Sequence, residues 1–311
     1  MLKRKEGYII VLSPLFKGRY HHMDINYLSP YIRVAMDSII EAPWTLAERV
    51  IFDYELLYIM EGEVLITVED KSYDGRPGDV FLFKPKEKHS ITVMGASRFR
   101  QPHLHFDLNY RQDSLDVKVS FKKLTEIEQK DQKKFRRDMT KEPGMQLPNK
   151  IVLRNIKLFE EMLFDIIKEF EAKSPYYELS LKGLFLRLWT YLLRENYWNE
   201  NPLAYNNMDE LMRVKEYLNC HTDREISLDD LSRMFNISKY HLIRLFNKVF
   251  SISPVHYHQM MRMEKAKKLI QFSNASITEI SEILGFSCIN SFSRAFRKME
   301  GVPPTFYRVK N

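Results

Sequence analysis

The stretch GFSCINSFSRAFRKMEGVPPTFYR, residues 285–308, carries the clearest structural pattern in the C-terminal part of the chain. Apolar residues that recur at i, i+3, i+4 and i+7 share one face of an α-helix. In this stretch that face is formed by Phe292, Ala295, Phe296 and Met299. The opposite face carries Asn290, Arg294 and Arg297. The spacing predicts a helix from about Cys288 to Met299, which taken alone is an ordinary amphipathic surface helix with solvated arginines.

A second copy of this pattern begins about fifty residues upstream. Two capping boxes, Ser227-x-x-Asp230 and Ser276-x-x-Glu279, lie 49 residues apart, and each marks the start of a helix. Beyond the following turn, equivalent positions of the two copies lie 50 residues apart. Leu242 corresponds to Phe292, Arg244 to Arg294, and Phe246 to Phe296. The repeat predicts two helix-turn-helix units, at about 227–250 and 276–299.

The turn of each unit carries residues suited to it. Asn236 and Gly285 hold equivalent positions, and both residue types tolerate the left-handed backbone of a tight turn. Ser238 and Ser287 follow at the same offset and are the predicted N-caps of the second helices. The change of offset means that the second unit has one extra residue in its turn.

The outward faces of the two second helices carry side chains that can read DNA bases. Arginine binds guanine through two hydrogen bonds, asparagine can do the same to adenine, and apolar groups contact the thymine methyl. We predict base contacts from Tyr240, Arg244, Ile289, Asn290 and Arg294. For a further set we predict phosphate contacts or simple solvation: Lys239, Lys248, Arg297 and Lys298.

Basic charge is concentrated in the same part of the chain. From Arg233 to Asn311 there are thirteen Lys and Arg against four Asp and Glu, a net charge of +9, whereas the whole chain carries +7. Neutralising phosphates requires positive charge at the binding surface. Charge alone is weak support, but together with a duplicated helix-turn-helix it favours double-stranded DNA as a partner.

Residues 207–311 resemble the DNA-binding domain of the AraC/XylS family of bacterial transcription regulators, through both units and the helix between them. The matching residues are Arg262-x-x-x-Ala266-x-x-Leu269-Ile270, Ile280-Ser281-x-x-x-Gly285-Phe286, Phe292-Ser293-Arg294-x-Phe296-Arg297-Lys298 and Gly301-x-Pro303-Pro304-x-x-Tyr307-Arg308. The chain departs from the family at Ser232 and Ser281, where alanine is usual, and at Ser251, where glycine is usual. The resemblance implies a sequence-specific regulator that responds to a small-molecule effector, forms a homodimer and, as an activator, contacts RNA polymerase.

The N-terminal third, from Ile9 to about Leu108, has the pattern of short strands separated by turns. The stretch ELLYIMEGEVLITV (55–68) predicts two strands around Glu61-Gly62, and RPGDVFLFKPKEKH (76–89) predicts another that ends at Pro85. Many short strands at near-regular spacing favour a small barrel or jelly roll. Glu55 to Gly62, Arg76 to Asp79, Pro85 and His89 resemble the cupin-like sensor domain of the same family. The resemblance implies a pocket for a small molecule such as a sugar.

Histidines in this region raise the question of a metal or ligand site. Cupin enzymes hold a metal with a His-x-His pair ahead of an acidic residue, but the stretch before Glu55 is ERVIFD (48–53). His103-x-His105-x-Asp107 comes later, on one face of a predicted strand. Alternation does not say which face is buried, so a metal site, a pocket wall and a solvated polar face all remain open. The resemblance favours the pocket, and it implies effector contacts from Arg49, Tyr54, His103 and His105, without metal or cofactor.

Two amphipathic helices are predicted after the strands. Their apolar stripes are Phe159, Met162, Leu163, Ile166, Ile167 and Phe170, then Leu181, Leu184, Phe185, Leu188 and Tyr191. Such a pair either packs on the barrel or dimerises, and the family resemblance favours dimerisation. The charged run 128–143 is expected to be a solvated linker, and the Asn-rich stretch 195–207 is expected to join the domains.

The remaining features bound the function. Cys220 and Cys288 are the only cysteines, which favours a reducing cytoplasm, and no secretory signal or membrane-spanning run is recognised. No phosphate-binding glycine motif or catalytic nucleophile motif is found, so an enzyme is not predicted. The predicted fold is a cupin-like barrel (1–125), a linker and helical segment (126–200), and a tandem helix-turn-helix domain (207–311). The alternatives are a metal-dependent cupin enzyme with an appended DNA-binding module, and a ligand-independent regulator.

Overall fold

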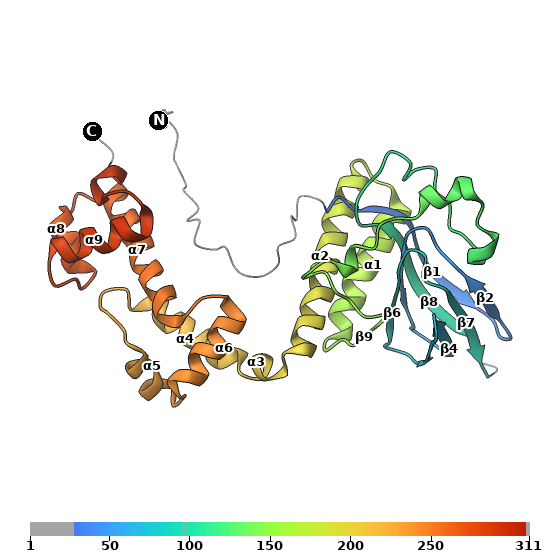
Figure 1. Cartoon of the computed structure of the whole chain (residues 1–311), viewed down its shortest axis with the longest axis horizontal. Helices are drawn as coiled ribbons and strands as arrows, with labels where there is room; N and C mark the ends of the chain where they lie inside the picture. The colour runs from blue at the N-terminus through green and yellow to red at the C-terminus, as the bar shows by residue number, and fades with distance from the viewer. Residues whose placement is uncertain (1–27, 96–97, 309–311) are drawn as a thin grey trace. The chain divides into compact units, whose positions relative to one another are not determined.

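The structure, a computed structural model, describes residues 28–95 and 98–308. The chain divides between Glu200 and Asn201 into two compact units (Figure 1). One has mixed β and α structure, within residues 28–200, and is called the sensor unit after the family resemblance given above; the other is the all-helical C-terminal unit, 201–308. The predicted strands before Leu28 lie outside the described residues.

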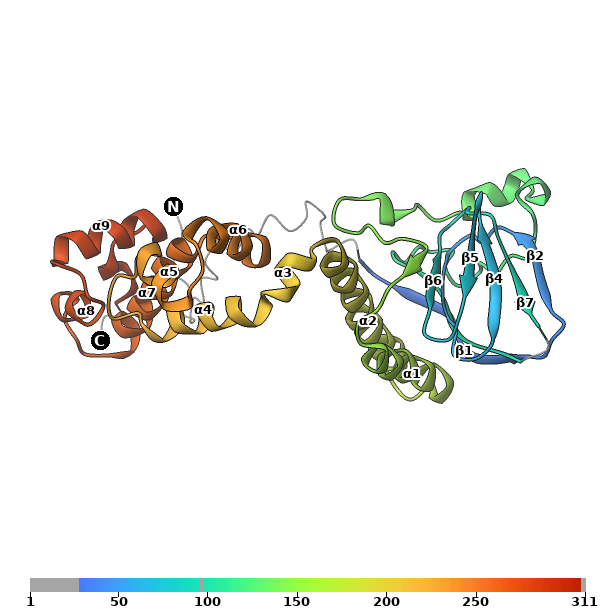
Figure 2. The ribbon, with the colours of Figure 1, turned by 90° about the horizontal axis from the view of Figure 1, so that it is seen from below.

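Two antiparallel β-sheets form the barrel-like layers of the sensor unit, so the predicted all-β domain is confirmed. One sheet has the strand order β1-β8-β3-β6-β9, and the other has the order β2-β7-β4-β5. Figure 2 shows the two layers, with helices α1 and α2 against one of them. The strands are β1 (Tyr31–Ile40), β2 (Thr45–Arg49), β3 (Tyr54–Tyr58), β4 (Glu63–Val68), β5 (Lys71–Gly75), β6 (Val80–Phe83), β7 (His89–Met94), β8 (Phe99–Asp107) and β9 (Lys150–Ile151).

The central strands of the five-stranded sheet are buried on both faces. On β3, Leu56 packs toward the helices, while its neighbour Leu57 packs between the two sheets. On β6, Leu82 packs toward the helices and Phe83 packs between the two sheets. Successive side chains of a strand point to opposite faces, so burial of both faces explains why β3 and β6 read as continuous apolar runs rather than as alternating ones.

Helices α1 (Ile156–Ala172) and α2 (Tyr177–Glu200) cover the outer face of this sheet. The rings of Phe185 and Trp189 on α2 lie 4.5 and 5.8 Å from that of Phe106 on β8, measured between centroids. The apolar stripes for which dimerisation was expected are therefore largely buried within one chain. A stripe buried on its own sheet is not available to a second copy, so dimerisation through this segment stays a prediction that requires other side chains of the two helices.

Two predicted linkers are structured. The charged run 128–143 contains the short 3₁₀ helices η3 (Gln129–Lys134) and η4 (Met139–Lys141), after η2 (Leu124–Glu126), and its Arg136 is buried. The stretch 195–207 continues α2 to Glu200 and then forms α3 (Pro202–Asn206). Glu195 is buried because its carboxylate accepts the backbone N–H of Arg154 at 2.7 Å. The expectation of a solvated linker at 128–143 was wrong for Arg136, because polar composition does not show which charges find buried partners. The boundary between the two units does fall within 195–207, as expected, although this stretch is helical.

The C-terminal unit contains the two predicted helix-turn-helix units. The first comprises α5 (Leu228–Phe235) and α6 (Lys239–Phe250), and the second comprises α8 (Ile277–Ile283) and α9 (Ile289–Glu300). The long helix α7 (Pro254–Phe272) joins them, while α4 (Met208–Cys220) packs against the first unit and η5 (Pro304–Tyr307) against the second. Figure 1 shows α7 running from the first helix-turn-helix unit to the second.

The capping residues explain where these helices begin. The Ser227 and Ser276 capping boxes form as predicted, and Ser238 caps α6 by accepting the N–H of His241. The predicted Ser287 cap is wrong, because α9 begins one residue later with Cys288 as its N-cap. The extra residue of the second unit thus lies before the cap. Ser251 takes a left-handed φ of 57° where the second unit has Gly301, which costs roughly 1–2 kcal/mol relative to glycine.

Gly285 is the position of the second unit that least tolerates a side chain. Its φ is +67°, and an added Cβ would lie 2.1 Å from the carbonyl oxygen of Asp223. Gly301→Ala, at φ +77° with open space around it, should cost only the conformational ~1–2 kcal/mol. Gly285→Ala adds a steric clash and should cost roughly 1–3 kcal/mol more.

Urea unfolding followed by circular dichroism at 222 nm measures this difference. Trp44, Trp189 and Trp198 are the only tryptophans and all precede residue 201, so tryptophan fluorescence in the same titration reports the sensor unit and should not change. Equal stability losses in the two alanine variants would contradict the proposed clash with Asp223.

Candidate functional site

The second helices of the two units expose the predicted base-reading residues. Tyr240 is 89% exposed on α6, and Arg244 is exposed one turn further along the same helix. On α9, Ile289, Asn290 and Arg294 are exposed. The reverse faces are fully buried through Leu242 and Phe246 in the first unit and Phe292 and Phe296 in the second. Each helix therefore has one face fixed in a core and one face free to enter a groove.

The predicted phosphate-contacting residues have different surroundings. Lys239 forms an ion pair with Asp229 of the preceding helix, so its charge is partly satisfied within the protein. Arg297 and Lys298 are exposed in the last turns of α9 and Lys248 in the last turn of α6. Within residues 28–95 and 98–308, no carboxylate lies within ion-pairing distance of Arg294 or Arg297.

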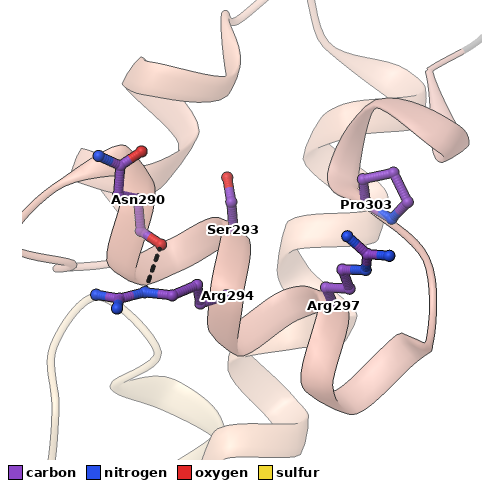
Figure 3. Close-up of a pocket in the computed structure, with 5 residues that line it drawn as sticks. All are labelled: Asn290, Ser293, Arg294, Arg297 and Pro303. Atoms are coloured by element: carbon purple, nitrogen blue, oxygen red, sulfur yellow. Dashed lines mark hydrogen bonds between the residues drawn. The ribbon is translucent and has the colours of Figure 1, made fainter.

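An open pocket lies along the exposed face of α9. Its volume is about 510 Å³, and it is lined by Asn290, Ser293, Arg294, Arg297 and Pro303 (Figure 3). The first four recur at i, i+3, i+4 and i+7 and thus share one face of the helix. Arg294 Nε donates a 3.4 Å hydrogen bond to the backbone oxygen of Asn290, which folds the guanidinium along the helix. The pocket walls carry two guanidinium groups and one amide, and their chemistry suits phosphates and base edges.

Helix α7 positions the second unit through a buried cation. Arg262 Nη2 donates to the carbonyl oxygen of Leu284 at 2.6 Å, and its guanidinium lies 4.1 Å from the ring centroid of Phe286. Burial lowers the pKa of Arg262 from its usual value. Nearby, burial also lowers the pKa of His258. Its two ring nitrogens face the backbone oxygens of Leu218 and Arg224, and these contacts act in the opposite direction by favouring the protonated ring. Arg262 ties the end of α8 to the linking helix and so orients α9.

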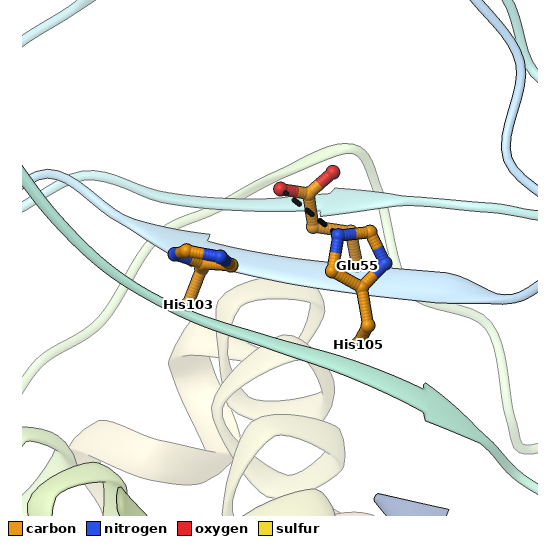
Figure 4. Close-up of side chains that lie close together, drawn as sticks. All are labelled: Glu55, His103 and His105. Atoms are coloured by element: carbon orange, nitrogen blue, oxygen red, sulfur yellow. Dashed lines mark ion pairs between the residues drawn. The ribbon is translucent and has the colours of Figure 1, made fainter. Parts of the chain in front are cut away.

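In the sensor unit, three of the four predicted effector residues gather around Glu55. The structure pairs Glu55 with His105 across β3 and β8, and His103 lies two residues earlier on the same face. Figure 4 shows the two imidazoles and the carboxylate close together, on the side of the sheet away from the helices. Arg49 joins them by donating from Nη2 to Glu55 Oε2 at 2.6 Å. His105 and Asp107 are almost fully buried, which excludes the solvated-face interpretation.

Each histidine of the cluster has a hydrogen-bond partner that orients its ring. His105 Nδ1 lies 3.3 Å from Asp53 Oδ1, and its Nε2 lies 3.7 Å from Glu55 Oε1. His103 Nδ1 faces the backbone oxygen of Gln101 at 3.0 Å. Arg49 Nε donates a 2.9 Å hydrogen bond to His89 Nε2. The other ring nitrogen of His89, Nδ1, lies 3.2 Å from the backbone oxygen of Glu87. The rings of His103 and His105 therefore both use Nδ1 for orientation.

The protonation states follow from this arrangement. Burial alone would raise the pKa of Glu55, but the Arg49 guanidinium and the neighbouring imidazoles outweigh burial and hold the pKa at about 2. Burial lowers the pKa of His89 to about 4, with Glu55 opposing the shift. Burial also lowers the pKa of His103. At neutral pH the cluster holds an ionised Glu55 beside neutral His89 and His103.

Tyr54 does not belong to this cluster. It is fully buried on the opposite face of β3, where its ring stacks on Phe106 with centroids 5.5 Å apart. Its hydroxyl oxygen accepts the N–H of Met139 at 2.6 Å, and burial strongly raises its pKa. The sequence hypothesis also missed Glu55 and Asp53 as members of the site. A carboxylate inside the apolar run ELLYIM was the available signal, since an unpaired charge would not be buried there.

A chain of buried charges extends from the cluster. Asp53 is bonded to Arg33 as well as to His105, and Arg33 Nη2 contacts Asp107 Oδ2 at 3.1 Å. Asp107 also lies 3.0 Å from Arg136 Nε and accepts the Ser114 hydroxyl at 2.7 Å. This network joins β1, β3 and β8 to the segment that carries the 3₁₀ helices.

Asp107→Asn should destabilise the sensor unit by about 3–5 kcal/mol, because it leaves two buried guanidinium groups without full compensation. The matched control is Glu61→Gln. Glu61 lies 2.7 Å from the half-exposed guanidinium of Arg98, so losing this ion pair should lower the stability by at most ~1 kcal/mol. Urea unfolding monitored by tryptophan fluorescence measures both. Similar losses would show that Asp107 contributes no more than a surface ion pair.

Among the described residues, no helix is long and apolar enough to cross a membrane.

Two domain models match the sequence of this chain. Residues 44–132 match the AraC-like ligand binding domain, and residues 231–310 match a helix-turn-helix domain. The HTH-type transcriptional regulator YisR of Bacillus subtilis is 23% identical, over 90% of this chain and 93% of its own. The Msm operon regulatory protein of Streptococcus mutans is 24% identical, over 93% of this chain and 96% of its own. Among solved structures, the C-terminal domain of AraT, a response regulator from Geobacillus stearothermophilus, is 32% identical over 32% of this chain and 82% of its own, with a TM-score of 0.31.

A ligand-binding β-domain followed by a helix-turn-helix domain is the domain organisation of a transcriptional regulator. The chain is an AraC-type transcriptional regulator with a ligand-binding domain.

Proposed function

We propose that α6 and α9 enter successive segments of the DNA major groove and read bases there. The observation that carries this proposal is the recurrence of one arrangement in both units, a helix buried on one face that exposes Arg244 in the first unit and Arg294 in the second. Tyr240, Ile289 and Asn290 supply the remaining base contacts. Lys248, Arg297 and Lys298 contact phosphates, and Lys239 does so after exchanging Asp229 for DNA.

The barrel of the proposed regulator binds a small-molecule effector that controls DNA binding. Arg49, His103 and His105 surround the Glu55 carboxylate with hydrogen-bond donors and acceptors, and such groups suit the hydroxyls of a sugar. Tyr54 does not contact the effector, because it lies on the other face of β3. The regulator acts in the cytoplasm, where its DNA lies, and an activator would also contact RNA polymerase.

The proposed regulator works as a homodimer. Tyr176, just before α2, and Leu179, in its first turn, are 85% and 71% exposed, although the apolar stripe of the helix is packed on the barrel. Apolar side chains left in water at one helix end suit a contact with a second copy. Two copies would place two pairs of reading helices across adjacent DNA half-sites.

Selection of bound DNA from a random-sequence pool, at two salt concentrations, tests the proposed DNA reading. We expect enrichment of a bipartite site whose halves lie about one helical turn apart. Steep salt dependence without an enriched motif would mean that the basic faces only contact phosphates. Light scattering on the selected complexes counts the protein copies, and a single copy per site would contradict the dimer.

Arg294→Ala should weaken binding to the selected site by ~1–3 kcal/mol and relax the preference at one base pair. The matched control is Arg297→Ala on the same helix, which should weaken all sequences alike and reduce the salt slope by about 1. Fluorescence anisotropy with the selected site, single-base variants and random DNA measures both. An equal loss on every sequence for Arg294→Ala would remove its role in base reading.

A sugar that binds the native barrel should raise the melting temperature of the sensor unit and change the affinity of the chain for its selected site. Tryptophan fluorescence follows the melting, since all three tryptophans lie in that unit. A shift that persists unchanged in an Arg49→Lys variant would place the sugar elsewhere. No shift with any sugar would favour the ligand-independent regulator.

A further inference from the structure

Three side chains of the sensor barrel converge with the chemistry of a metal site. Glu55, His103 and His105 each offer one ligand atom, and these atoms all lie within 4.8 Å of one another (Figure 4). Glu55 and His105 are cross-strand partners on β3 and β8, so the sheet itself fixes their separation. We propose that Glu55, His103 and His105 bind one divalent transition-metal ion in the barrel.

The orientation of the two imidazoles supports this assignment. Histidines that bind metals usually donate the N–H of their other ring nitrogen to a carboxylate or a backbone carbonyl. His105 Nδ1 faces Asp53 Oδ1 at 3.3 Å, and His103 Nδ1 faces the oxygen of Gln101 at 3.0 Å. Both partners leave Nε2 as the nitrogen with a lone pair to give. His105 Nε2 already lies 3.7 Å from Glu55 Oε1.

The carboxylate is oriented in the same manner. Arg49 Nη2 holds Glu55 Oε2 at 2.6 Å, so Oε1 is the oxygen that faces His105. A carboxylate that binds a metal through one oxygen commonly has the other oxygen hydrogen-bonded. The Arg49 cation also repels a bound dication, so this three-ligand site should bind metal more weakly than a closed four-ligand structural zinc site.

The donor set selects the class of ion. Two imidazole nitrogens and one carboxylate suit Zn²⁺, Co²⁺, Ni²⁺ or Fe²⁺, whereas Mg²⁺ and Ca²⁺ prefer sites built from oxygen alone. Three protein ligands leave coordination positions open. His103 is only partly buried, which gives an ion a route to the cluster. The open positions would accept oxygen atoms of the effector, a step that rests on the proposed effector function of the barrel.

Titration of the metal-free full-length chain with Co²⁺ and with Zn²⁺ tests the site, by calorimetry and by the visible spectrum of Co²⁺. We expect one ion per chain and a rise in the melting temperature of the sensor unit, with no effect of Mg²⁺. His103→Ala should reduce the affinity at least ~100-fold, since loss of even an outer partner costs ~10–100-fold. His103 is the best variant because its contact with Gln101 lies within its own strand, so folding should survive.

Two controls separate this site from adventitious binding. His256→Ala removes a histidine of the C-terminal unit, and His21→Ala with His22→Ala removes the adjacent pair near the N-terminus. Both should retain the wild-type affinity for Co²⁺. Absence of stoichiometric binding, or unchanged binding in His103→Ala, would overturn the metal site.

The metal site and the proposed effector function can fail separately. If sugars raise the melting temperature of chain that binds no metal, the effector proposal stands and the metal site falls. If metal binds and His103→Ala lowers its affinity as expected, but no sugar raises the melting temperature with or without metal, the metal site stands and the sugar proposal falls. DNA selection is independent of both results.

Discussion

Burial of both faces of the central strands of the five-stranded sheet is the constraint on which the sensor unit depends. Helices α1 and α2 cover one face and the second sheet covers the other, so water reaches few polar groups of β3 and β8. A charge left unpaired in such a place costs several kcal/mol. Glu55 therefore binds Arg49, and Asp107 binds Arg33 and Arg136. The same constraint that forces these pairs also fixes the positions of the histidines between them.

The C-terminal unit applies the same principle to the buried cation Arg262. Arg262 donates to the carbonyl of Leu284, the last residue before the turn at Gly285, and stacks over Phe286. A helix end leaves backbone carbonyls without partners, so a buried donor there satisfies an otherwise costly group. The start of α9 is thus set from α7, by a residue outside the helix-turn-helix unit itself. The direction in which Asn290 and Arg294 point depends on this contact.

The sequence predicted the tandem helix-turn-helix well because its signals are local. Capping boxes, turn residues and 3.6-residue periodicity all act within a few residues, and only the N-cap of α9 was misplaced, by one position. The barrel site depends on strand register, which joins Glu55 to His105 across fifty residues. A one-residue step along a strand reverses its face, and for this reason Tyr54 was wrongly grouped with Arg49. Register follows from packing of the whole sheet, so no short motif reveals it.

Charge is distributed in opposite ways in the two units, and the contrast bears on function. In the barrel, the buried guanidinium groups of Arg33, Arg49 and Arg136 each have a carboxylate partner. On α9, Arg294 and Arg297 have no carboxylate partner among the described residues. They lie four and seven residues after Asn290 and share one exposed face of the helix with it. Paired charges specify a fold, while exposed unpaired charges of one sign repel one another unless an anion lies between them. A polyanion with regular spacing, such as the DNA backbone, relieves that repulsion along the whole face.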